Sequence, residues 1–125
     1  MKTRASTALA LSFAASFFAI GLPYWQIPYA TVALPNSIMG FGLIVVALLA
    51  ALSRIVSAAR LWPITLIVGA SVPCAVLARV AHDTAADPTS HNLWPLEAIL
   101  SAGPGLLAAL LGAVAVGILK ARSGA

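Results

Sequence analysis

Charged residues are scarce in this sequence. Only 8% of its 125 residues are charged, and no charged residue occurs between Arg4 and Arg54. Soluble domains carry about 25% charged residues, so this chain lies far outside their usual composition. It also has 62% hydrophobic residues and a mean hydropathy of +1.03. This combination excludes an ordinary soluble domain and predicts a membrane protein.

Residues that known membrane enzymes, exporters and cytochromes use for their function are also missing. Cys74 is the only cysteine, which excludes an internal disulfide and the CxxC pair of thiol–disulfide exchange enzymes. The first apolar run contains no glutamate, which the small multidrug exporters require there. Both histidines, His82 and His91, lie outside the apolar runs, unlike the haem-binding histidines of membrane b-type cytochromes. We therefore expect no cofactor and no catalytic centre. Because no basic cluster is interleaved with aromatic residues, we expect no nucleic-acid partner.

Four apolar runs in the sequence are long enough to cross a bilayer. The hydrocarbon core is roughly 30 Å thick and a helix rises about 1.5 Å per residue, so a span needs around 20 apolar residues. The predicted spans cover residues 5–22, 37–57, 61–80 and 95–119. Prolines and polar residues separate the first two runs, which gives a first outer loop at residues 23–36. The second outer loop, residues 81–94, separates the third and fourth runs. The sequence thus predicts a single-domain, all-α, antiparallel bundle of four transmembrane helices.

The first run has an alternative interpretation. Lys2 and Arg4, the apolar run after them and the small residues around Ala19 and Gly21 are similar to a secretory signal peptide with its cleavage site. Under this alternative, residues 1–21 would be removed and three spans would remain. The orientation of those three spans would be unchanged.

The basic residues predict how the chain is oriented. Cytoplasmic loops of membrane proteins are enriched in lysine and arginine. Six of the seven basic residues fall on one side of the predicted spans, namely Lys2, Arg4, Arg54, Arg60, Lys120 and Arg122. Arg79 is the exception, and we expect its long side chain to reach the interface on the outer face of the membrane. Both termini are therefore predicted to be cytoplasmic, in a multi-pass inner-membrane protein whose alanine richness suits a bacterium.

Small residues spaced four apart predict where helices meet, because helices in lipid associate through close backbone approach. The third run carries Ala70, Cys74 and Ala78, and the fourth carries Ala109, Ala113 and Gly117. Prolines also mark these two runs. Pro63 and Pro95 fall in predicted first turns, whereas Pro73 and Pro104 lie inside the helices and predict local kinks.

Most remaining ionisable groups gather near the second outer loop. This candidate cluster consists of Arg79, His82, Asp83, Asp87, His91 and Glu97. Imidazole and carboxylate groups are ligands for zinc and similar ions, so His82, Asp87 and His91 are the candidate metal ligands. The competing interpretation is structural. In it Asp87, followed by Pro88, is a helix N-cap, Glu97 faces the positive end of the fourth helix, and Arg79 pairs with Asp83.

The sequence predicts a non-enzymatic accessory or assembly subunit, because the outer cluster contains no nucleophile with an orienting base. Its partners would be the lipid bilayer and either another membrane protein or further copies of itself. The alternative is a transporter or channel component, linked to a metal through the outer loop. A solute path normally needs polar groups within the spans. The candidates there are Ser12, Ser16, Thr65, Ser71 and Ser101.

Overall fold

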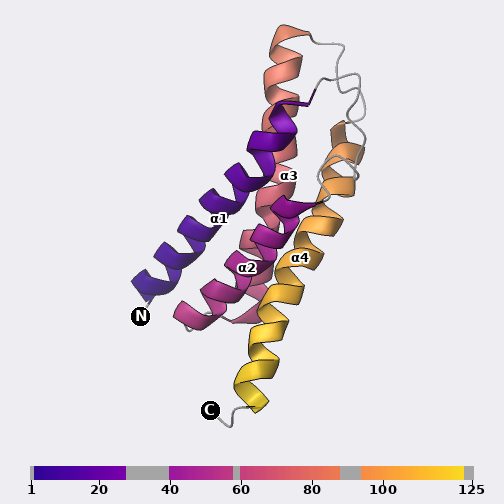
Figure 1. Cartoon of the computed structure of the whole chain (residues 1–125). Coiled ribbons are helices and arrows are strands. Elements are labelled where there is room, and N and C mark those ends of the chain that lie inside the picture. Colours follow the sequence, from indigo (N-terminus) through magenta and orange to yellow (C-terminus); the bar gives the residue numbers. More distant parts are fainter. Residues whose placement is uncertain (1, 28–39, 58–59, 88–93, 123–125) are drawn as a thin grey trace.

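The computed structural model describes residues 2–27, 40–57, 60–87 and 94–122. Almost all of these residues are α-helical, and they form four helices (Figure 1). The helices are α1 (Lys2–Trp25), α2 (Phe41–Val56), α3 (Leu61–Ala86) and α4 (Trp94–Arg122). The predicted all-α class is thus confirmed. In Figure 1, the first residues of α1 and the last residues of α4 lie toward the same end of the molecule.

Three of the helices are long and apolar enough to cross a membrane. They are Ser6–Trp25 within α1, and the whole of α3 and α4, with mean hydropathies of 1.6, 2.0 and 2.1. The described part of α2 has 16 residues. At about 1.5 Å per residue it is roughly 24 Å long, shorter than the bilayer core of roughly 30 Å. Residues 37–39, where the second span was predicted to begin, lie outside the described residues.

Helix α1 extends further than the sequence predicted. The first outer loop was placed at residues 23–36, but α1 continues through Pro23 to Trp25. Pro23 has no N–H to bond the carbonyl of Ala19, so a break was expected there. Instead, that carbonyl lies 3.2 Å from where a side chain on Gly42 of α2 would begin. Pro23 removes only this one hydrogen bond, and the helix ends two residues after it. Residues 28–36 of this loop lie outside the described residues.

Helix α3 also extends beyond its predicted end. The second outer loop was placed at residues 81–94, but α3 continues to Ala86. Alanines at positions 81, 85 and 86 favour helix, and the Thr84 hydroxyl donates to the Val80 carbonyl at 2.7 Å. Asp87, predicted to be a helix N-cap, is instead the C-cap of α3, where its N–H donates to the Asp83 carbonyl. Helix α4 begins at Trp94, one residue before the predicted position.

Glycines mark the closest approaches between helices. A methyl group on Gly112 of α4 would overlap the backbone carbonyl of Ala47 in α2. A methyl group on Gly105 of α4 would lie 2.7 Å from the Gly69 carbonyl of α3. That carbonyl has no intrahelical partner because Pro73, four residues later, has no N–H. Helix α4 therefore packs on both α2 and α3 with little side chain between the backbones.

The predicted stripes of small residues are correct on α4 and wrong on α3. Ala109 and Ala113 are fully buried, as predicted for the fourth span. On α3, Ala70, Cys74 and Ala78 are only partly buried. The buried face of that helix carries larger residues instead: Ile64, Val68, Val72 and Val76. Gly69, next to Ala70, makes the close contact, so the predicted stripe lies about 100° away around the helix.

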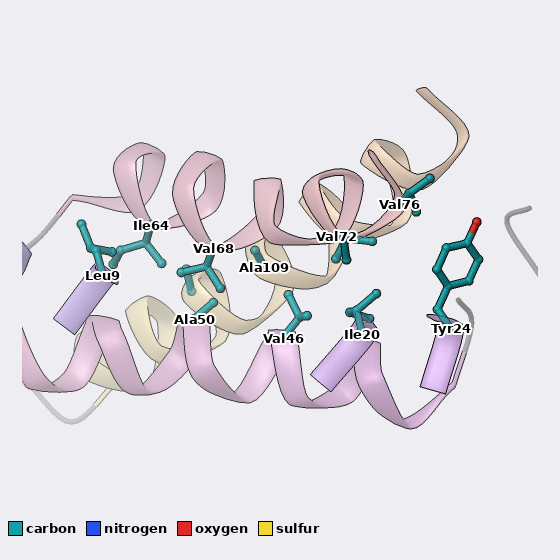
Figure 2. Close-up of a cluster of buried hydrophobic side chains, with 12 residues drawn as sticks. Leu9, Ile20, Tyr24, Val46, Ala50, Ile64, Val68, Val72, Val76 and Ala109 are labelled. Carbon is teal, nitrogen blue, oxygen red and sulfur yellow. The ribbon is translucent and has the colours of Figure 1, made fainter. Parts of the chain in front are cut away.

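The core consists mainly of valine, isoleucine and alanine side chains where the helices meet (Figure 2). Tyr24 is the largest of its fully buried side chains and lies at one end of the cluster in Figure 2. Large apolar side chains instead face outward. They include Phe41, which is 79% exposed, and Leu48, Ile99 and Leu111. A soluble protein of this size would not leave so many large apolar side chains uncovered.

Candidate functional site

Arg79 occupies the centre of the outer cluster, and it is buried. Its side chain is only 7% exposed and points toward α1. The expected position at the membrane interface stays a prediction. Two of its terminal nitrogens donate to backbone carbonyls at the end of α1, those of Tyr24 at 2.7 Å and Ile27 at 2.5 Å. Its Nε donates to a carboxylate oxygen of Asp83 at 3.2 Å. The predicted ion pair between Arg79 and Asp83 is therefore confirmed.

The position of Arg79 follows from the needs of α1. The last four carbonyls of any helix lack intrahelical partners, and cations are favourable at that end. Helix α1 has no basic residue of its own in its last turn. Arg79 of α3 supplies one, and its guanidinium carbon also lies 5.1 Å from the centre of the Tyr24 ring. A residue on one helix thus caps the end of another.

Trp25 makes a second link between α1 and α3. Its indole N–H donates to the Ala75 carbonyl at 2.9 Å, one turn before Arg79 on α3. The ring folds back over Gly21, where any side chain would collide with it. Phe17 and Phe18 meet the ring edge-on, with centroid distances of 5.2 and 6.2 Å. These contacts fix the indole at the outer end of α1.

An open cleft of about 420 Å³ lies beside these links. Its described lining residues are Trp25, Ala78, Arg79, His82 and Asp83. His82 is 87% exposed, and its Nδ1 lies 3.5 Å from the second carboxylate oxygen of Asp83. The cleft therefore presents an arginine, a carboxylate, an imidazole and an indole within one space.

The remaining predicted residues are placed differently. Glu97 lies in the first turn of α4, as predicted, where its charge favours the positive end of that helix. Asp87 is exposed at the end of α3 and does not line the cleft. His91 lies outside the described residues.

The metal prediction is not tested by these positions. Within the described ranges, no three His, Cys, Asp or Glu side chains come together in a group that could hold a metal ion. The predicted set of His82, Asp87 and His91 includes a residue that is not described. It stays a prediction.

Sequence reasoning missed Tyr24 and Trp25 as parts of the site. Tyr24 is 1% exposed, and its hydroxyl has no hydrogen-bond partner among the described residues. Two signals were available in the sequence. A lone arginine within an apolar run needs hydrogen-bond acceptors, and the end of a neighbouring helix offers backbone carbonyls.

The buried hydroxyl groups are mostly bonded locally. Thr65, Ser71 and Ser101 each donate to a backbone carbonyl three or four residues earlier in their own helix. Ser12 of α1 and Ser53 of α2 are hydrogen-bonded to one another at 2.6 Å. Ser16 is buried with no partner among the described residues. These groups stabilise helices and one helix contact.

No protein-family model, curated protein or solved structure matches this chain. The functional assignment accordingly depends on the residues of the chain itself. The geometry brings Arg79, His82 and Asp83 together with Trp25 and Tyr24.

Proposed function

We propose that this protein is a multi-pass inner-membrane protein that serves as a non-enzymatic accessory or assembly subunit. It would form an antiparallel bundle of four transmembrane helices, with both termini in the cytoplasm of a bacterium. Its partner would be a larger membrane protein or further copies of the same chain. The proposal has three supports, which concern its surface, its charges and the use of its buried arginine.

The surface supports a lipid environment. Leu11 and Leu22 on α1, Leu48 on α2 and Leu107 on α4 are all more than half exposed. Lipid tails are as apolar as leucine, so such side chains carry no penalty when they face the bilayer. The antiparallel arrangement is supported by paired contacts. Ser12 bonds Ser53, while Ile20 contacts Gly42, so residues later in α1 meet residues earlier in α2.

The charges support the orientation. Arg54, Lys120 and Arg122 lie in the last turns of α2 and α4, and Lys120 donates to the Arg54 carbonyl at 2.9 Å. Asp83 and Asp87 lie at the far end of α3 from Arg60. This segregation matches the enrichment of basic residues on cytoplasmic loops.

The observation that carries the non-enzymatic role is the use of Arg79. It is the only charged side chain that is buried among the described residues, and its hydrogen bonds hold α1 to α3. A buried charge that serves catalysis would be expected to face a reacting group beside a nucleophile or base. Arg79 instead joins α1 to α3 at the C-terminal end of α1. A surface held in place in this way suits docking.

Affinity purification from native membranes tests the proposal. We expect a defined partner or oligomer to copurify, and we expect the double variant His82→Ala with His91→Ala to retain it. Reporter fusions test the topology. A fusion near residue 58 should report the cytoplasm, and one near residue 88 the opposite side. A monomer without partners would contradict the subunit role, and both fusions on one side would contradict the topology.

A further inference from the structure

We propose that the cleft beside Arg79 binds the headgroup of a zwitterionic phospholipid. The ammonium group would lie against Asp83 and Trp25, and the phosphate against His82 and Arg79. This inference rests on the proposed membrane location. It does not depend on the accessory role.

Opposite charges line this cleft at short range. The Arg79 guanidinium and the Asp83 carboxylate are 3.2 Å apart, so a ligand with one net charge would meet attraction and repulsion of similar size. A ligand that carries both charges can align each with its opposite. The volume of about 420 Å³ is open on one side, which allows a headgroup to enter while its tails stay outside.

Each part of the headgroup has a matching group in the cleft. A primary ammonium donates three hydrogen bonds, and an indole face attracts cations. Asp83 and Trp25 supply the carboxylate and the indole. For the phosphate, the exposed imidazole of His82 donates through Nε2 when that nitrogen carries a proton. Among the described residues, Arg79 donates three of its five N–H groups to Tyr24, Ile27 and Asp83, which leaves two.

The surface next to the cleft favours a lipid over a soluble zwitterion. Phe18 and Leu22 on α1 are each about half exposed, at 51% and 52%. Phe18 contacts the Trp25 ring, so an apolar surface continues from the cleft along the helix. Acyl chains attached to a bound headgroup would lie on this surface. A soluble zwitterion would leave it uncovered.

Lipid binding to the purified, delipidated full chain tests the proposal. Native mass spectrometry in detergent would compare phosphatidylethanolamine, phosphatidylcholine and phosphatidylglycerol, with glycerophosphoethanolamine as the soluble headgroup. We expect phosphatidylethanolamine to bind about tenfold more tightly than phosphatidylglycerol, the value of roughly one charge-assisted hydrogen bond. Phosphatidylcholine should be intermediate because its ammonium donates no hydrogen bond. Equal binding of the three lipids would overturn the proposal, and so would tighter binding of the soluble headgroup.

Variants locate the effect in the cleft. Asp83→Asn should abolish the preference for phosphatidylethanolamine, and His82→Ala should weaken binding without disturbing the fold, because that side chain is exposed. Asp87→Asn is the matched control, since Asp87 is an exposed carboxylate outside the cleft. An unchanged preference in Asp83→Asn, or an unchanged affinity in His82→Ala, would overturn the proposal. Copurification of a protein partner is a separate measurement. The lipid-binding result can therefore be interpreted even if no partner copurifies.

Discussion

The two ways in which the helices are joined differ in kind. Helix α1 is joined to α3 by side-chain hydrogen bonds, because Arg79 and Trp25 each reach a backbone carbonyl of the opposite helix. Helix α4 is joined to α2 and α3 by close backbone approach at Gly112 and Gly105. Lipid provides no hydrophobic drive for helices to associate, so packing and hydrogen bonds must do so. The polar joint depends on a few bonds, and the glycine joint depends on the absence of side chains.

Removal of the Arg79 side chain should break the polar joint. Arg79→Ala removes the hydrogen bonds that the guanidinium donates to the Tyr24 carbonyl, the Ile27 carbonyl and the Asp83 carboxylate. We expect a loss of about 2–4 kcal/mol in unfolding free energy, typical of breaking a buried charged network. Denaturation in mixed micelles, followed by circular dichroism, measures it. The control is Arg60→Ala, an exposed arginine before α3 that makes no side-chain cap bond. Equal losses in both variants would contradict the polar joint.

A single methyl group should break the glycine joint. In Gly112→Ala the new carbon would overlap the Ala47 carbonyl, and a backbone cannot yield as a side chain can. We expect a loss of about 1–3 kcal/mol from overpacking. Gly117→Ala is the control on the same helix, because the added carbon would make only an ordinary contact, 3.4 Å from the Arg54 guanidinium. That variant should be neutral or slightly stabilising, since alanine favours helix by up to about 1 kcal/mol. The same denaturation experiment compares them, and a neutral Gly112→Ala would show that α2 and α4 do not meet there.

Local patterns predicted much of this fold and part of the site. The apolar runs gave the long helices, and the four-residue spacing of Arg79 and Asp83 gave their ion pair. The direction of the Arg79 side chain was not predictable from such patterns. It depends on the carbonyls of Ile27 and Tyr24, which are 52 and 55 residues away in sequence. The face of α3 was misjudged for a similar reason. Ala70 and Gly69 are both small enough for a close helix contact. Which of them makes the contact depends on where α4 lies, and α4 lies against Gly69.

The Tyr24 hydroxyl tests whether the polar joint includes more than Arg79 and Trp25. It is buried with no partner among the described residues, and such a group costs about 1–3 kcal/mol. Tyr24→Phe keeps the ring beneath the Arg79 guanidinium and removes only the oxygen. We therefore expect stability to stay unchanged or to rise by about 1 kcal/mol, in the same denaturation experiment. A clear loss of stability would mean that the hydroxyl has a bonding partner.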